Sequence, residues 1–308
     1  MRAIDSRGQA TSDAGGRGVR ISRRWFLAIS ATACFVGGPA RALHRERFVA
    51  LGAEAEISLS GDGALAARAF VECRREVEAV EAAFSLWRED SVISRLNRHG
   101  RVRRPGSMFV ELAEFAREIA ELSHGGFDPT VQSFWQGDGI VDWRGLEVSP
   151  FGARFTREGM SATFNGIAQG YAADRVIGVL ERLGYRDALA NLGEFRGIGE
   201  REPGGPWRIG VEHPLTGDIA EVIEGAGAVA TSEPRATLVR GQPHIFDPLA
   251  RGGERWASVT VMAETGWRAD ALSTAIAAAP VEEAEDLLRR GKAKGAVLID
   301  RVGRVRRL

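Results

Sequence analysis

The chain has 308 residues, of which 44% are hydrophobic and 27% are charged, and its 41 basic residues balance 41 acidic ones. Such apolar content can bury a large core, so the composition excludes a globally disordered chain and fits one large domain or two closely packed halves. The neutral balance also provides no excess of positive charge for binding nucleic acid.

The first 42 residues differ in composition from the rest. They contain Arg23-Arg24, an apolar run over 25–38 and the small-x-small sequence Ala40-Arg41-Ala42. This order predicts a twin-arginine signal peptide over 1–42, which sends a folded protein to the periplasm. The apolar run is shorter than the about 20 residues of a membrane helix, so we expect no stable span after cleavage. Retention as an N-terminal anchor is the alternative.

Removing this segment would leave 34 basic and 39 acidic residues, a net charge of −5, which argues further against a nucleic-acid partner. Of the two cysteines only Cys73 would remain, so no intramolecular disulfide could form. Cys73 lies in a helix-like run, and we expect it to be a small buried apolar residue.

The first half of the predicted domain, residues 43–308, combines strands with amphipathic helices. The patterns predict a strand at 48–59 with Gly52 inside it, a turn at 61–63, and helices at 64–84, from about 91 to 96, and at 107–123. Asp90 or Ser91 can cap the short helix because each side chain can accept a free amide hydrogen.

Asp128-Pro129-Thr130 is typical of a helix start, with aspartate as the N-cap and proline at the first helical position. A ligand role for Asp128 is the alternative. Short strands with glycine turns are expected between 140 and 164.

Residues 163–174 form the stretch around which we expect the chain to be organised. A short apolar strand is predicted to run into a helix that ends at Gly184. Glycine allows a ligand to approach the backbone, and the first amides of a helix lack internal partners, so Gly166 and Gly170 mark a candidate diphosphate site. The alternative is that both glycines only allow tight helix packing.

The second half of the domain is predicted to be antiparallel and rich in turns. We expect strands at 186–192, 207–211, 219–223, 227–231 and 257–263, hairpins at 235–246 and around Gly303, and helices at 267–278 and 281–290.

Asp270 and Thr274 are four residues apart on the helix predicted at 267–278 and therefore lie on one face. A carboxylate beside a hydroxyl oxygen suits a hard cation, magnesium rather than zinc. The alternative is an N-cap aspartate with a threonine that bonds to its own helical turn.

A second polar cluster spans 244–248. In an extended chain His244 and Phe246 share a face, and His244 could contact a phosphate or accept a proton; a structural histidine is the alternative. The sequence contains no Walker loop, dinucleotide-binding glycine fingerprint, Cys-x-x-Cys pair, serine hydrolase elbow or metalloprotease helix. Phosphate chemistry would therefore need another scaffold.

Seven short blocks together give the chain a resemblance to the ApbE family of FAD:protein FMN transferases over 48–308. They are Phe84-Ser85-Leu86-Trp87 with Ser91 and Asn97, Gly126-Phe127-Asp128-Pro129-Thr130, Asn165 to Tyr171, Asn191-Leu192-Gly193, Ala230-Thr231-Ser232, His244 to Pro248 and Ala269 to Thr274. The resemblance implies an α+β fold rich in antiparallel sheet, similar to the tunnelling fold, with flanking helices and a central FAD cleft.

The resemblance also implies the roles of individual residues. Magnesium would be held by the Ala168 carbonyl, Asp270 and Thr274, with the Ser273 carbonyl nearby. Trp87 would stack on the isoalloxazine ring, and the other cofactor-binding residues would be Gly126, Phe127, Asp128, Asn165, Gln169, Tyr171, His244 and Ile245. Asp270 or His244 would assist the proton of the incoming hydroxyl.

The implied activity is magnesium-dependent transfer of FMN from FAD to a threonine or serine of a target protein, with release of AMP. An FAD pyrophosphatase and a non-catalytic flavin-binding accessory protein are the alternatives. Trp87, Gln169, Leu51-Gly52-Ala53 and Glu194-Phe195 depart from common family residues. With the export signal, these departures resemble the branch associated with nitrous oxide reduction, which would serve a periplasmic or membrane-bound electron-transfer protein.

Overall fold

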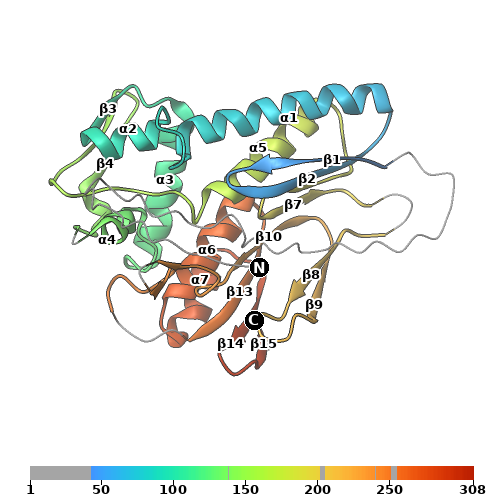
Figure 1. The fold of residues 1–308 in the computed structure, drawn as a ribbon. Helices are drawn as coiled ribbons and strands as arrows, with labels where there is room; N and C mark the ends of the chain where they lie inside the picture. The colour runs from blue at the N-terminus through green and yellow to red at the C-terminus, as the bar shows by residue number, and fades with distance from the viewer. Residues whose placement is uncertain (1–42, 138, 202–204, 240, 251–254) are drawn as a thin grey trace, which may run out of the picture.

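The computed structural model describes residues 43–308 except 138, 202–204, 240 and 251–254 (Figure 1). The predicted signal peptide therefore lies outside the described residues. Within the described part of the chain, no helix is both long enough and apolar enough to cross a membrane. The helices are α1 (Gly63–Phe84), α2 (Val92–His99), α3 (Ser107–Leu122), α4 (Gln132–Gln136), α5 (Ala168–Arg182), α6 (Gly266–Ala278) and α7 (Ala284–Arg290).

The principal sheet has eight strands in the order β1-β2-β6-β7-β10-β13-β14-β15, and every neighbouring pair is antiparallel. Its strands are β1 (Leu43–Ala50), β2 (Ala53–Ser60), β6 (Ala188–Asn191), β7 (Phe195–Ile198), β10 (Gly227–Ser232), β13 (Trp256–Ala263), β14 (Gly295–Asp300) and β15 (Val305–Arg307). Small sheets are formed by β3 (Arg101–Arg103), β4 (Leu146–Ser149) and β5 (Gly152–Phe155), by β8 (Arg208–Glu212) with β9 (Ile219–Glu224), and by β11 (Leu238–Val239) with β12 (Gln242–Pro243). This architecture confirms the predicted α+β class.

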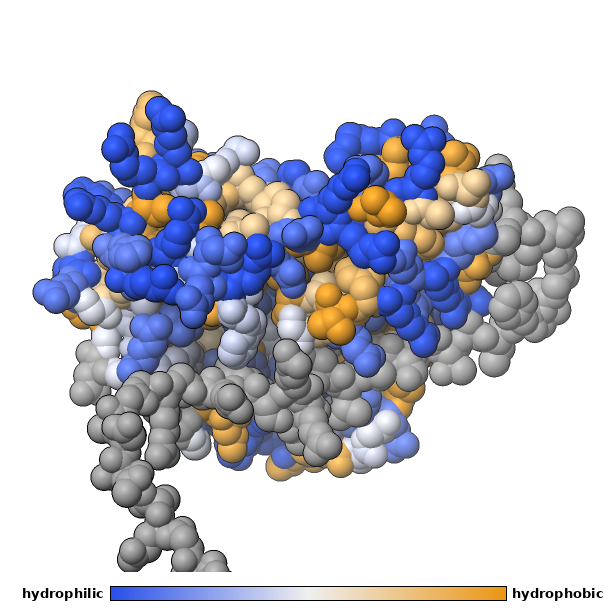
Figure 2. Space-filling model, turned by 45° about the horizontal axis from the view of Figure 1, so that its top comes forward, coloured by the Kyte–Doolittle hydropathy of each residue, from blue (hydrophilic) through white to orange (hydrophobic). Residues whose placement is uncertain are grey.

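Helices α5 and α6 pack on the principal sheet, and α1 covers α5 (Figure 1). Aromatic rings fill the space between these helices and α3: Phe84 stacks on Phe109 with centroids 5.5 Å apart, and Phe164 lies within 5.5 Å of both rings. Figure 2 shows the face that carries α1 as mostly hydrophilic, with small apolar areas between charged residues. Helix α1 thus buries one stripe, which includes the fully buried Cys73 as predicted.

The strand predicted at 48–59 is wrong because two strands occupy this region. Leu51 and Gly52 both adopt left-handed conformations, with φ of 51° and 81°, and join β1 to β2. Two left-handed central residues define a tight hairpin turn whose twist matches that of the strands. Gly52 therefore marks a reversal of the chain rather than a close approach within one strand.

The strand predicted just before α5 is also absent. Residues 160–164 belong to no strand or helix, and side chains satisfy part of their backbone: the Asn97 amide donates to the Ala162 carbonyl and accepts from its N–H, both at 2.8 Å. The Ser133 hydroxyl likewise accepts from the Ser161 N–H at 2.7 Å. These side chains take the place of a neighbouring strand.

Most other predicted elements are confirmed within a few residues at their ends. The Ser91 hydroxyl caps α2 by accepting from the Ser94 N–H at 3.1 Å. The predicted hairpins are formed by β11 with β12 and by β14 with β15. His244 follows β12, which ends at Pro243, so the strand alternation considered for 244–247 does not occur.

The backbones of α5 and α6 touch where Gly170 meets Gly266. A Cβ added at Gly170 would lie 2.1 Å from the Gly266 carbonyl oxygen, and one added at Gly266 would lie 2.2 Å from the Gly170 oxygen. Neither position can therefore accommodate a side chain without moving a helix. For Gly170, the tight-packing alternative is confirmed.

Carboxylates fix this crossing from both sides. Asp174 of α5 accepts from the N–H groups of Gly266 and Trp267 at 2.7 and 3.0 Å, and Asp270 of α6 accepts from the Gly170 N–H at 2.9 Å. Each helix thus carries a glycine and, four residues later, an aspartate that binds free amides in the first turn of the other helix.

Gly170→Ala should lower the free energy of unfolding by about 1–3 kcal/mol or more, because the added Cβ has no space at the crossing. Gly178→Ala is the matched control on the same helix, where a Cβ would meet only an Arg182 nitrogen at 3.6 Å. It should be neutral or add up to about 1 kcal/mol through helix propensity. Urea unfolding of both variants measures this, and equal effects would contradict the proposed crossing constraint.

Candidate functional site

The crossing of α5 and α6 buries the Asp270 carboxylate, which is only 3% exposed. Burial raises its pKa to about 7, and hydrogen bonds from the backbone of Gly170 and Gln169 oppose that shift. Asp270 is the fifth residue of α6 and binds α5, so the expectation that it might cap its own helix is wrong.

A group of hydroxyls adjoins Asp270. The Ser232 hydroxyl, at the end of β10, lies 2.8 Å from the Ser273 hydroxyl and 3.2 Å from that of Thr274. Ser273 donates to the carbonyl of Asp270 at 2.9 Å. Thr274 donates to the Gly166 carbonyl at 3.5 Å rather than to its own turn. The prediction that Asp270 and Thr274 belong to one face of a helix is confirmed.

This donor set has the chemistry of a hard cation site. One carboxylate, several hydroxyls and the carbonyls at the start of α5 supply oxygen only, which favours magnesium or calcium over zinc. No group of three or more histidine, cysteine, aspartate or glutamate residues that could hold a metal occurs among the described residues. The residues fit magnesium, with Asp270, Thr274 and the Ala168 carbonyl as candidate ligands and the Ser273 carbonyl nearby.

The amides at the start of α5 are not free to hold a diphosphate. The N–H groups of Ile167 and Ala168 donate to the Phe164 carbonyl, and that of Gly170 donates to Asp270. The predicted diphosphate site on these amides is therefore wrong, because a carboxylate of the same chain already occupies the N-terminal position that an anionic ligand would take.

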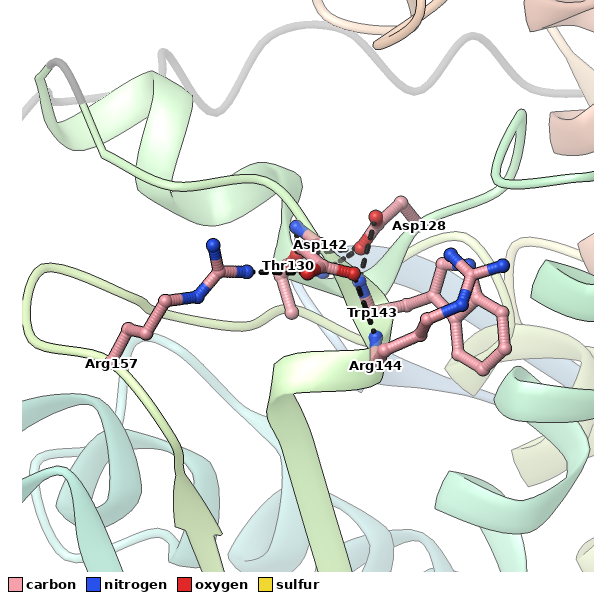
Figure 3. A network of polar contacts seen from close by, with 6 residues as sticks. All are labelled: Asp128, Thr130, Asp142, Trp143, Arg144 and Arg157. Atoms are coloured by element: carbon pink, nitrogen blue, oxygen red, sulfur yellow. Dashed lines mark hydrogen bonds and ion pairs between the residues drawn. The ribbon is translucent and has the colours of Figure 1, made fainter.

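Asp128 is buried and lies at the centre of a polar network that reaches the surface at Arg157 (Figure 3). Its carboxylate accepts from the N–H and hydroxyl of Thr130 at 2.7 and 2.6 Å and from the Trp143 N–H at 2.9 Å. The Thr130 hydroxyl in turn accepts from the Asp142 N–H at 2.8 Å, and Asp142 pairs with Arg157. The N-cap prediction for Asp128 is confirmed, and its ligand role stays a prediction. Gly126 and Phe127 are buried just before it.

Two other predicted cofactor-binding side chains are accessible. Trp87 is 59% exposed after α1, beside the β1–β2 turn, so its ring could stack on a ligand. Asn165 is exposed in the loop before α5. Gln169 is half-buried, and its amide lies against Gly193 in the β6–β7 turn.

The remaining predicted residues lie elsewhere. Tyr171 is 2% exposed in the aromatic core, where its hydroxyl donates to Glu111, and burial raises its pKa. The His244 N–H donates to the carbonyls of Pro234 and Thr237, and burial lowers the pKa of its imidazole. Ile245 packs against the main core. Within the described chain, no hydrogen bond joins these residues to the Asp270 cluster.

Sequence reasoning missed the roles of Asp174 and Glu194. The repeated Gly-x-x-x-Asp spacing at 170–174 and 266–270 is the signal that could have identified Asp174. Glu194, 7% exposed in the β6–β7 turn, accepts from the Thr231 N–H at 2.9 Å. Its pKa is raised well above the usual range, first by burial and then by the charge of Asp270. No local pattern places it beside that residue.

Two curated proteins that are similar to this chain are both named FAD:protein FMN transferase. The chain is 26% identical over 273 residues to the FAD:protein FMN transferase of Haemophilus influenzae, covering 73% of this chain and 78% of that protein. It is 28% identical over 239 residues to the FAD:protein FMN transferase of Vibrio cholerae, covering 67% and 71%.

Solved structures share the fold. The ApbE protein of Thermotoga maritima, 26% identical, superposes with a TM-score of 0.77 over 86% of this chain and 97% of that one. The apo flavinyl transferase ApbE of Pseudomonas stutzeri, 24% identical, has the same fold with a TM-score of 0.75 over 87% and 94%. The model of the ApbE family matches residues 51–299, and the chain therefore belongs to the ApbE family.

Proposed function

We propose that this chain is a magnesium-dependent FAD:protein FMN transferase. Membership of the ApbE family and the name shared by its curated relatives support the transferase activity. The observation that carries the magnesium requirement is the oxygen cluster at α6. The hydroxyls of Ser232, Ser273 and Thr274 lie together there, and the buried Asp270 carboxylate is one helical turn before Thr274.

In the proposed reaction, a threonine or serine hydroxyl of an acceptor protein attacks the FMN-side phosphorus of FAD. The bond from that phosphorus to the bridging oxygen breaks, AMP leaves with the bond's electron pair, and FMN stays attached to the acceptor as a phosphoester. A magnesium ion bound in the oxygen cluster would neutralise charge on the diphosphate oxygens.

The chain's own residues take distinct roles in this proposal. Asp270, Thr274 and the Ala168 carbonyl hold the ion, and Trp87 stacks on the isoalloxazine. The burial that lowers the pKa of His244 keeps its imidazole neutral near pH 7, the form that can accept the hydroxyl proton. Asp270 is the other candidate for that proton.

We also propose that the enzyme acts in the periplasm after twin-arginine export. Its acceptor would then be a periplasmic or membrane-bound electron-transfer protein with an exposed threonine or serine. The paired arginines and apolar run before residue 43 support this location.

Asp270→Asn should reduce FMN transfer by at least about 100-fold, because the charge that holds the ion is lost. Asparagine can still accept from the Gly170 N–H, so the fold should remain. The measurement is the mass gain of one FMN on a candidate acceptor domain incubated with FAD and magnesium. Glu81→Gln, which changes a carboxylate that accepts from the Leu51 N–H at 2.7 Å, is the control and should transfer normally.

Normal magnesium-dependent transfer by Asp270→Asn would remove this residue from the proposed site. Release of AMP and free FMN by the unaltered chain, without an acceptor mass gain from any candidate, would instead indicate a pyrophosphatase.

Trp87→Ala should raise the FAD dissociation constant about 10-fold or more, because stacking on an aromatic ring contributes about 1–3 kcal/mol. Trp87→Phe should retain most of the affinity. Phe151→Ala, which removes an 84% exposed ring, is the control for a general surface effect. Titration of flavin fluorescence reports these constants, and an unchanged value for Trp87→Ala would exclude stacking by this residue.

Without divalent cations, the free energy of unfolding should fall as pH rises from 5 to 8. The pKa of Asp270 is about 7 in the folded chain and about 3.9 when unfolded, so its contribution is fully present below the unfolded pKa. That contribution is lost as pH rises through the folded pKa. A difference of one pH unit between the folded and unfolded pKa corresponds to about 1.4 kcal/mol of stability.

Urea unfolding in a chelator at both pH values measures this slope. Asp270→Asn should make the slope shallower, with the remainder coming from Glu194, whose pKa burial also raises. Saturating magnesium should restore stability at pH 8 in the unaltered chain only. An equal slope in the variant would show that other groups cause the pH dependence.

A further inference from the structure

Asp270 and Glu194 are two buried acidic residues that border the same group of hydroxyls, Asp270 from α6 and Glu194 from the β6–β7 turn. They are 3% and 7% exposed, and both accept from backbone amides around the same site: Asp270 from the Gly170 N–H, and Glu194 from the N–H of Thr231, the residue before Ser232. No arginine, lysine or histidine among the described residues forms an ion pair with either of them. Burying unpaired charges costs several kcal/mol each, and two like charges together cost more.

The backbone of the β6–β7 turn fixes the position of Glu194. Gly193 has a left-handed conformation with φ of 97°, and the Leu192 N–H donates to the Glu194 carbonyl at 3.0 Å. A Cβ at Gly193 would lie 2.2 Å from the Gln169 amide nitrogen. The β6–β7 turn therefore packs closely against the first turn of α5. Asp270 accepts a hydrogen bond from the Gly170 N–H in that same helical turn.

Hydrogen bonds connect Glu194 to the oxygen cluster. Its Oε2 accepts from the Thr231 N–H at 2.9 Å, and the next residue, Ser232, contacts the hydroxyls of Ser273 and Thr274. Within the described residues, Oε2 is the only Glu194 side-chain oxygen with a hydrogen bond. The other oxygen, Oε1, remains available to a ligand.

Either a shared proton or a bound cation can relieve the two charges. The surrounding groups favour a cation, because hydroxyl and carbonyl oxygens together with carboxylates are the ligands of hard divalent ions. A proton shared between two carboxylates needs no further oxygen ligands, whereas a divalent cation does, and the hydroxyls at Thr274 could supply them.

We propose that Glu194 supplies a second carboxylate to the divalent cation bound by Asp270 and Thr274. This inference rests on the proposed magnesium site and deepens it. Two carboxylates balance the charge of the ion, so the ion should bind before FAD and without help from its diphosphate. Glu194 is then a determinant of metal affinity in this chain, and Gln169 adds no competing cation beside it.

The test is metal binding without FAD. The full chain, stripped with a chelator, is titrated with Mn²⁺ and followed by electron paramagnetic resonance, and with Mg²⁺ by calorimetry. Glu194→Gln keeps an oxygen that can accept from the Thr231 N–H but removes the charge. This variant should raise the dissociation constant for Mn²⁺ and Mg²⁺ at least about 10-fold. Its thermal midpoint in the metal-free state should stay close to that of the unaltered chain, because glutamine can make the same hydrogen bond and the raised pKa of Glu194 already favours the uncharged carboxyl.

Two further variants make the result specific. Glu81→Gln, the control described above, should change neither the dissociation constant nor the metal-free midpoint. Glu194→Asp keeps a carboxylate on a side chain one methylene shorter, so its oxygens no longer reach the ion, and it should weaken metal binding without raising the metal-free midpoint. This variant replaces Glu194→Gln as the test if Glu194→Gln does not fold.

Unchanged Mn²⁺ affinity in Glu194→Gln, with binding lost in Asp270→Asn, would overturn this inference and leave the proposed magnesium site intact. Binding by the unaltered chain only when FAD is present would also overturn it. No binding with or without FAD would reject the magnesium site itself.

Discussion

The contact between Gly170 and Gly266 is the constraint on which the rest of the structure depends. Two helices can approach this closely only where neither has a side chain, and the carbonyl of each glycine fills the space beside the other. Asp174 and Asp270 then bind the free amides that the approach brings within reach. Because the helices follow different parts of the chain and pack on different strands of one sheet, this crossing joins the two halves of the domain.

The same contact creates the chemistry of the site. Asp270 is buried because it lies in the crossing, and burial raises its pKa. The start of α5 is held near the β6–β7 turn through Gln169 and Gly193, which brings a second carboxylate to the same place. The fold thus concentrates negative charge where it also gathers hydroxyls, an arrangement that a divalent cation would stabilise. In the proposed site, a bound cation would offset the cost of burying these carboxylates.

Several short blocks that resemble the family serve the fold directly. Asp128 satisfies three donors of its own neighbourhood, and Tyr171 anchors α5 in the aromatic core. Asn97 replaces a missing strand partner for the segment that leads to α5. A motif can therefore identify a family while many of its residues position the site rather than contact a ligand. Trp87, exposed beside a tight turn, is the opposite case, because no packing requirement explains an accessible tryptophan there.

The sequence by itself determined the features that depend on residues close together in the chain. Helical periodicity predicted α1, α3, α5 and α6, short polar side chains marked the caps at Ser91 and Asp128, and a spacing of four placed Asp270 and Thr274 on one face. It could not determine which groups meet across the fold. The amides of α5 meet Asp270, a hundred residues later, and Glu194 approaches the same carboxylate because of strand order and helix crossing. Only the tertiary structure decided these contacts, because periodicity and capping report the partners within one element, while burial and charge at the site arise from elements distant in sequence.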